Sequence, residues 1–368
     1  MSQNPLVALG RLGQSPWYDY ITRDLLASGA LDRLIAEDGL LGLTSNPTIF
    51  EKAIGTSALY DDDIRRQAET GASPAQVFEA LAVADVQAAC DRFRAVYERA
   101  GNGDGTVSLE VSPALAHDTA GTVAEARRLW RAVDRPNLLV KIPGTREGIP
   151  AIAQCIEDGI SVNVTLLFSV DRYREVIDAW FLGLERRATA GHPLGGLRSV
   201  ASFFISRVDS KVDPLLDRAG DPHGLRGRVA IANAALAYAA FEESLASSRW
   251  QALAALGAVP QRPLWASTST KDPAYADVHY VEALVAPRTV NTLPPETFAA
   301  YRDHGRPAVR IGEALATAPD RLAALAALGI DLAAVTAELE REGVEKFAAS
   351  HRSLLQVIEQ KAGALAAR

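Results

Sequence analysis

The sequence is poor in cysteine and lysine and has no long apolar run. It has only two cysteines in 368 residues, Cys90 and Cys155, which excludes a disulfide-dense secreted scaffold and is typical of a reducing compartment. No apolar stretch approaches the ~18 residues of a membrane span, and the first residues lack a charged-then-apolar signal pattern. We therefore expect a cytoplasmic protein without a membrane partner.

Basic charge is also limited. The chain has 38 Lys and Arg against 45 Asp and Glu, a formal net charge of −7, and no basic block, which disfavours a nucleic-acid partner. Arginine supplies most of the positive charge. A lysine inside a strand then indicates a need for its amine, because arginine cannot lose its proton and act as a nucleophile. The lysines are Lys52, Lys141, Lys211, Lys271, Lys346 and Lys361.

Short apolar strands alternate with helical stretches along nearly the whole chain. This alternation predicts βαβ units and a parallel sheet. No glycine-rich dinucleotide motif follows the first strand, so we predict a closed (β/α)8 TIM barrel, fold class α/β. We expect a single domain over residues 1–368, with the barrel at about 15–300 and a helical C-terminal segment at about 308–367. Strands are predicted near residues 17–20, 40–44, 106–112, 137–144, 161–167, 199–205, 263–268 and 286–293, and helices near 31–37, 51–99, 119–133, 147–158, 171–190, 225–247 and 273–284.

Three of the predicted strands carry polar residues on one face. Side chains alternate between the two faces of a strand, and Val107, Leu109 and Val111 oppose a polar set. A half-exposed antiparallel sheet gives the same alternation, but the intervening helices favour parallel strands and a polar barrel interior. The polar sets are Thr106, Ser108, Glu110 and Ser112; Ser161, Asn163 and Thr165; and Gly42, Thr44 and Asn46.

Lys141 lies in the middle of the apolar strand predicted at 137–144. Burying an ammonium costs several kcal/mol unless it is paired or deprotonated. Burial lowers the pKa of a lysine, and a neutral amine can attack a carbonyl to form a Schiff base. The alternative to a catalytic role is a structural one: Lys141 could extend to water from an edge strand, or it could be held in an ion pair.

Polar residues from several strands converge with Lys141 on the predicted interior. In such barrels the chemistry lies at the carboxyl ends of the strands. Imine chemistry needs a neutral amine and a positioned proton donor for the loss of water. Taken singly, Asp19 is also explained as a turn or cap residue, and Glu110 as a structural partner of Lys141. The converging residues are Asp19, Asn46, Glu110, Lys141 and Thr165.

Five motifs, spread in order along the chain, resemble those of the transaldolases, Schiff-base-forming enzymes of the pentose phosphate pathway that need no cofactor. Two further stretches, 265–268 and 286–294, resemble the longer bacterial branch of this family. The five motifs are LTSNPTIF at 43–50, VSLEVS at 107–112, LVKIPGT at 139–145, NVTLLFS at 163–169 and ASFFISRVD at 201–209.

The resemblance implies a transferase that moves a dihydroxyacetone unit between sugar phosphates. Lys141 would form the Schiff base with the ketose carbonyl. Glu110, with Thr165 holding a water, would relay protons during dehydration and hydrolysis. Asp19 would take the proton from the C4 hydroxyl as the C3–C4 bond breaks.

The same resemblance implies the substrate-binding residues. Asn46 and Ser202 would hold hydroxyls of the dihydroxyacetone unit. Arg207 would bind the substrate phosphate, a task that suits a bidentate guanidinium. An acidic chain that binds a phosphorylated sugar requires such a local cation.

One departure concerns a second phosphate-binding arginine, which family members often carry after the seventh strand. This chain has Ser269, Thr270 and Lys271 there. Lys271 with the two hydroxyls is a possible replacement, and a solvated loop lysine is the alternative. Arg288 is a weaker candidate for the same role.

Other functions are weighed against the transferase. An aldolase of the same structural group would release free dihydroxyacetone. A non-catalytic sugar-phosphate-binding barrel would tolerate loss of Lys141. The six histidines show no metal-ligand spacing, so no metal is expected, and no nucleophile-elbow motif indicates a serine hydrolase. The sequence leaves open whether the chain is a monomer or a homodimer.

Overall fold

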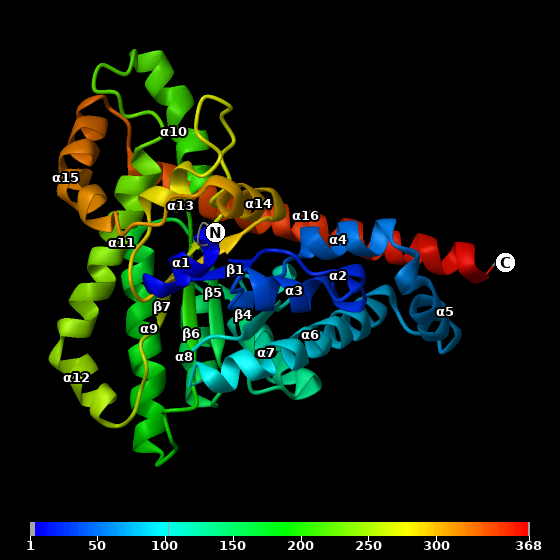
Figure 1. The fold of residues 1–368 in the computed structure, drawn as a ribbon. Helices are drawn as coiled ribbons and strands as arrows, with labels where there is room; N and C mark the ends of the chain where they lie inside the picture. Colours follow the sequence, from blue (N-terminus) through cyan, green and yellow to red (C-terminus); the bar gives the residue numbers. More distant parts are fainter. Residues whose placement is uncertain (1–3, 102, 367–368) are drawn as a thin grey trace.

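The computed structural model describes residues 4–101 and 103–366 and confirms the predicted α/β class. Eight parallel strands close into a barrel in sequential order, β1 to β8, with β8 paired to β1. Helices surround this barrel (Figure 1). The strands are β1 (Gln14–Tyr18), β2 (Gly42–Leu43), β3 (Thr106–Glu110), β4 (Leu138–Pro143), β5 (Val162–Leu167), β6 (Ser199–Phe204), β7 (Arg262–Ala266) and β8 (Thr289–Leu293).

Sixteen α-helices and two short 3-10 helices occupy the described residues. Their bounds are α1 (Pro5–Arg11), α2 (Arg23–Ala27), α3 (Ala30–Glu37), α4 (Pro47–Thr56), η1 (Ala58–Tyr60), α5 (Asp61–Glu69), α6 (Pro74–Arg99), η2 (Pro113–Leu115), α7 (Thr119–Val133), α8 (Gly148–Glu157), α9 (Val170–Thr189), α10 (Ser206–Ala219), α11 (Val229–Ala246), α12 (Ser248–Ala255), α13 (His279–Ala283), α14 (Pro295–His304), α15 (Ile311–Ala327) and α16 (Leu332–Ala366).

The predicted polar interior is present. Asn163 on β5 bridges the barrel: its Nδ2 donates to Ser108 Oγ on β3 at 3.0 Å, and its Oδ1 accepts from Ser202 Oγ on β6 at 2.7 Å. Strands β3 and β5 are not neighbours, so the first bond crosses the interior. Buried polar groups need such partners, and the bridge places Ser202 beside the strand that carries Thr165.

Several boundaries differ from the sequence predictions. β1 begins at Gln14, not Trp17, and β2 has two residues instead of five. The helical region predicted at 51–99 is divided, because Ser57 and Ser73 each cap the start of a new helix. Helices α1, α10, α12 and α14 were not predicted. α10 contains Pro214, a residue that disfavours a helix interior.

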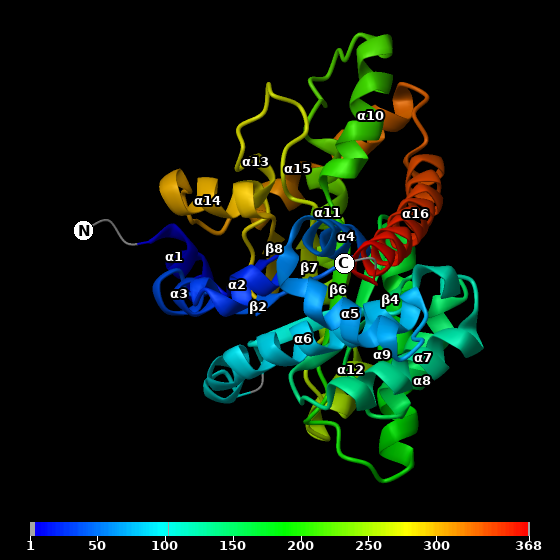
Figure 2. The same cartoon turned by 90° about the vertical axis from the view of Figure 1, so that its right-hand side faces the viewer.

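The C-terminal segment is two helices and not one continuous helical stretch. The chain turns between α15 and α16, where Gly329 has a φ of 75°. α16 then runs alongside α4 (Figures 1 and 2). In the part of the chain that is described, no single helix is long and apolar enough to cross a membrane. Helices α15 and α16 reach the length and apolar composition of a membrane span only when they are taken together, and the chain bends by 93° between them.

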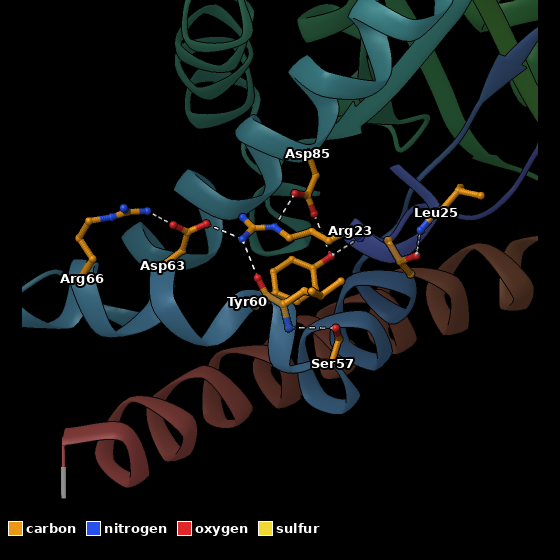
Figure 3. Close-up of polar contacts among 9 residues, drawn as sticks. Arg23, Leu25, Ser57, Tyr60, Asp63, Arg66 and Asp85 are labelled. Carbon is orange, nitrogen blue, oxygen red and sulfur yellow. Dashed lines mark hydrogen bonds and ion pairs between the residues drawn. The ribbon is translucent and has the colours of Figure 1, made fainter. Parts of the chain in front are cut away.

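A buried polar cluster joins α2, η1 and α6 (Figure 3). Arg23 Nε donates to Asp85 Oδ1 at 2.9 Å, and the Tyr60 hydroxyl donates to Asp85 Oδ2 at 2.9 Å. Arg23 also pairs with Asp63 on α5. Asp85 is 3% exposed, so these contacts replace the water that its carboxylate loses on folding.

Candidate active site

A cavity of about 410 Å³ opens at the carboxyl ends of the strands. This is the end of the barrel where the loops after the strands converge. Seven of the eight predicted site residues line it, although they come from widely separated parts of the chain. They are Asp19, Asn46, Lys141, Thr165, Ser202, Arg207 and Lys271.

The eighth residue, Glu110, contacts Lys141 directly. The two residues are register partners on the adjacent strands β3 and β4, and Glu110 Oε2 lies 3.3 Å from Lys141 Nζ. Their side chains are only 4% and 5% exposed. Lys141 Nζ also donates to the backbone carbonyl of Ser45 at 3.2 Å. Burial raises the pKa of Glu110 although the charge of Lys141 opposes that shift.

Asp19 follows β1 directly and faces the cavity. Its Oδ1 accepts a hydrogen bond from Thr44 Oγ1 at 2.7 Å. Burial raises the pKa of this carboxyl, while Lys141, the Thr44 bond and Arg207 lower it. A carboxyl with a raised pKa next to cationic groups is suited to accept and return a proton.

The backbone and the strand pairing of β5 are irregular next to Thr165. The pairing of β5 with β6 shifts register between Val164 and Leu167, and Leu166 has a φ of 61°. Such irregularities cluster near active sites, where they re-aim side chains. The Thr165 hydroxyl is buried and has no hydrogen-bond partner among the described residues, so it is available to a group in the cavity.

Asn46 and Ser202 present complementary atoms. Asn46 Oδ1 caps α4 by accepting from the Ile49 backbone N–H at 3.0 Å, which leaves the amide N–H groups to donate. The Ser202 hydroxyl donates to Asn163 at 2.7 Å, which leaves its oxygen lone pairs to accept. Asn46 can therefore donate a hydrogen bond to one hydroxyl group of a bound molecule, and Ser202 can accept a hydrogen bond from another.

The family model described as transaldolase/fructose-6-phosphate aldolase matches residues 16–358. The chain belongs to this family. A protein of Acidothermus cellulolyticus named transaldolase is 54% identical over 360 residues, which is 96% of each chain. Proteins with the same name from Frankia alni and Thiobacillus denitrificans are 51% and 50% identical, over 98% and 95% of this chain and 98% of each relative.

This member of the transaldolase/fructose-6-phosphate aldolase family places Arg207 and Lys271 in the same cavity. The Arg207 guanidinium carbon lies 4.9 Å from the centre of the Phe204 ring, and burial lowers the pKa of Arg207. Lys271 Nζ donates to Ser269 Oγ at 2.6 Å. Lys271 is an exposed residue of the cavity lining, and partial desolvation lowers its pKa.

Arg288 does not contribute to this site, contrary to the weaker suggestion from the sequence. It immediately precedes β8, so it lies at the amino ends of the strands, and its Nη2 pairs with Glu242 at 2.7 Å. Arg288 lines a separate hollow with Thr106 and Leu139. The carboxyl ends of the strands, where Lys141 opens to the cavity, are at the other end of the barrel.

The sequence reasoning missed several cavity residues. Lys346 and Phe347 come from α16, and Lys52 comes from α4. The Phe347 ring centre lies 5.7 Å from Lys141 Nζ and 5.9 Å from the Arg207 guanidinium carbon. No strand-end motif indicates α16, but the scarcity of lysine is a signal that could have drawn attention to Lys52 and Lys346.

The described residues contain no cluster of three or more His, Cys, Asp or Glu side chains able to hold a metal ion. Both cysteines are buried and unpaired. The polar groups that face the cavity are amines, a guanidinium, carboxylates, hydroxyls and an amide. This set is suited to carbonyl and proton-transfer chemistry on a hydroxylated anionic molecule.

Proposed function

We propose that this protein is a transaldolase. It would transfer a dihydroxyacetone unit from a ketose phosphate (sedoheptulose 7-phosphate or fructose 6-phosphate) to an aldose phosphate (glyceraldehyde 3-phosphate or erythrose 4-phosphate). The reaction belongs to the non-oxidative pentose phosphate pathway. The observation that carries the proposal is the buried Lys141 amine, 3.3 Å from Glu110 and open to a polar cavity.

The first half of the proposed reaction takes place at Lys141. Its neutral amine attacks the ketose C2 carbonyl and forms a carbinolamine, which loses water to give an iminium ion. Glu110 is close enough to take a proton from the amine and to return one to the departing hydroxyl. The raised pKa of Glu110, caused by burial, favours a carboxyl that is protonated for part of the cycle. Thr165 would hold the water.

Cleavage of the C3–C4 bond then needs a base at the C4 hydroxyl. Asp19 supplies it in this proposal: the proton of the C4 hydroxyl moves to the carboxylate, the electrons of the C3–C4 bond move into the iminium, and an enamine remains on Lys141. The aldose phosphate leaves. When an acceptor aldehyde arrives, Asp19 returns a proton to the new hydroxyl.

The remaining residues would bind and orient the sugar. The donating amide of Asn46 and the accepting oxygen of Ser202 suit hydroxyls of the dihydroxyacetone unit. Arg207 and Lys271 suit the phosphate. Holding the reacting groups in place in this way lowers the entropic barrier to the reaction.

An aldolase that releases free dihydroxyacetone is the competing function, and the description of the matching family model covers both activities. Transfer requires that the enamine be protected from water until an acceptor binds. Phe347 supports transfer, because its ring lies 5.7 Å from Lys141 Nζ and only 4% of the residue is exposed.

The experiment that tests the proposal compares two products. Fructose 6-phosphate and erythrose 4-phosphate should give sedoheptulose 7-phosphate, and fructose 6-phosphate alone should give little free dihydroxyacetone. Rapid release of dihydroxyacetone without an acceptor would assign the aldolase activity instead. Neither product would mean that the proposed reaction is wrong.

A further inference from the structure

Lysine is concentrated in the cavity. Six of the 38 basic residues of the chain are lysines, and four of those six line this one cavity. Among the described residues, Arg207 is the one arginine that lines the cavity. The acidic lining residues are Asp19 and Glu296, so the cavity is cationic although the whole chain carries −7. The four lysines are Lys52, Lys141, Lys271 and Lys346.

α16 is held in place at both ends of its path. Near its start, Lys211 on α10 pairs with Glu338 at 2.8 Å. Further along, the Ser350 hydroxyl bonds to the Thr48 hydroxyl of α4 at 2.8 Å, and Lys361 Nζ donates to the backbone carbonyl of Ile54 at 2.9 Å. Lys346 lies between these contacts, so the part of α16 that holds Lys346 at the mouth of the cavity is fixed on both sides.

The turn of α16 that carries Lys346 approaches Arg207 closely. A Cβ atom added at Gly343 would lie 3.0 Å from Leu166 Cδ2 and 3.7 Å from Arg207 Nη1. Phe347 lies beneath Lys141 and beside Arg207. Residues 343, 346 and 347 are three and four positions apart and therefore share one face of the helix. Lys346 is directed to the cavity by the same turn.

Arg207, Lys271 and Lys346 form a group of like charges that lacks carboxylate partners within ion-pair distance among the described residues. Burial is the main cause of the lowered pKa of Lys271; the charge of Glu296 opposes that shift, and the charges of Arg207 and Lys346 add to it. Gathering like charges in one place costs free energy, because each charge raises the energy of its neighbours. A multivalent anion bound among them relieves that repulsion.

We propose that Lys346, from the C-terminal helix, is a substrate-phosphate ligand that acts together with Arg207 and Lys271. This inference deepens the proposed function and rests on it, because the phosphate is taken to be that of the sugar. It also gives α16 a direct role: the helix completes the binding site and does more than cover the barrel. Lysine suits this role as a mobile point charge at the exposed mouth.

The test measures the binding of inorganic phosphate to the full-length protein by calorimetry. Lys346→Ala should raise the Kd about fivefold to tenfold, the range for loss of one charge-assisted contact at a partly exposed site. Lys346→Arg should restore most of the affinity, and Lys346→Gln should behave like the alanine variant. In steady-state transfer, Lys346→Ala should raise the KM for fructose 6-phosphate more than it lowers kcat.

Arg341→Ala is the matched control. Arg341 is an exposed residue of α16 outside the cavity lining, and its removal changes the net charge equally. It should leave the Kd of phosphate unchanged within about twofold, because Arg341 does not line the cavity and its exposed charge is screened by solvent and salt. Equal effects of the two alanine variants, or a wild-type Kd in Lys346→Ala, would overturn the inference.

A separate measurement distinguishes this failure from failure of the proposed function. Borohydride trapping of wild-type protein with dihydroxyacetone, which has no phosphate, reports only on the amine chemistry of Lys141. Successful trapping with an unchanged Kd in Lys346→Ala overturns the role of Lys346 alone. Failed trapping counts against the proposed function, while the phosphate measurements still decide whether Lys346 binds the anion.

Discussion

Glu110 Oε2 lies 3.3 Å from Lys141 Nζ, and the two residues face each other in register on neighbouring strands of the barrel. Both side chains are at most 5% exposed. Strand pairing therefore fixes their separation, and burial strengthens their interaction. A pair placed in this way can pass a proton between carboxyl and amine without movement of the backbone.

Replacement of Glu110 tests the proton relay. Glu110→Gln keeps the size of the side chain but cannot accept and return a proton. We expect kcat for the transfer reaction to fall about 10²- to 10⁴-fold, the usual contribution of a positioned acid-base group. Glu79→Gln is a control, since Glu79 pairs with Arg128 and does not line the cavity that Lys141 faces. A kcat within about twofold of wild type in Glu110→Gln would rule out the relay.

If Asp19 is the base of the proposed mechanism, its hydrogen bond from Thr44 should influence the acid limb of the pH profile. This bond favours the ionised carboxylate of Asp19. Burial already raises the pKa of Asp19, and loss of the bond would raise it further. In the proposed mechanism the base form of Asp19 is needed for cleavage, and this form is lost as the pH falls through its pKa. In Thr44→Val the acid limb of kcat/KM should therefore move upward by about 1 pH unit.

Thr292→Val is the companion variant for this measurement. Its hydroxyl lies 2.6 Å from Thr44 Oγ1, and because Thr44 donates its hydrogen to Asp19, Thr292 donates to Thr44. Its loss should produce a smaller shift in the same direction. A downward shift in Thr44→Val, or none in a folded variant, would contradict the role given to Asp19.

The Arg23–Tyr60–Asp85 cluster of Figure 3 should contribute to stability and not to catalysis. Asp85→Ala removes the acceptor of the buried Tyr60 hydroxyl and of Arg23 Nε. The Arg23 guanidinium then keeps its polar contacts with Asp63 and the Leu59 carbonyl. We expect the free energy of unfolding to fall by about 3 kcal/mol, and by about 1 kcal/mol in Tyr60→Phe, measured by urea denaturation.

Asp62→Ala is the control for that series, because Asp62 pairs with Arg65 at the surface and its side chain is 92% exposed. It should change the stability by no more than about 0.5 kcal/mol. If the Asp85 and Asp62 variants were equally stable, the buried cluster would not contribute as described. The folded Asp85 variant should keep the wild-type kcat.

The barrel could be predicted because its signals are local. Strand alternation, as at Val107, Leu109 and Val111, identifies the face that packs on the helices, and the opposite face then points inward. The site residues at the strand ends, such as Lys141 and Thr165, follow from the same reasoning together with the family motifs. These residues are close in space because consecutive parallel strands bring their carboxyl ends together.

The contribution of α16 could not be predicted in the same way. Phe347 and Lys346 lie about two hundred residues from Lys141 in the sequence, and helical periodicity does not reveal which part of the barrel a C-terminal helix contacts. Helix α10 was missed for a local reason, since Pro214 within it opposes the helical pattern.

Reductive trapping at Lys141 tests the Schiff base most directly. The protein is incubated with fructose 6-phosphate and borohydride, digested, and analysed by mass spectrometry of its peptides. We predict a stable adduct on Lys141 and loss of that adduct in Lys141→Met. An adduct on another lysine, or no adduct with a folded protein, would contradict the assignment of this amine as the nucleophile.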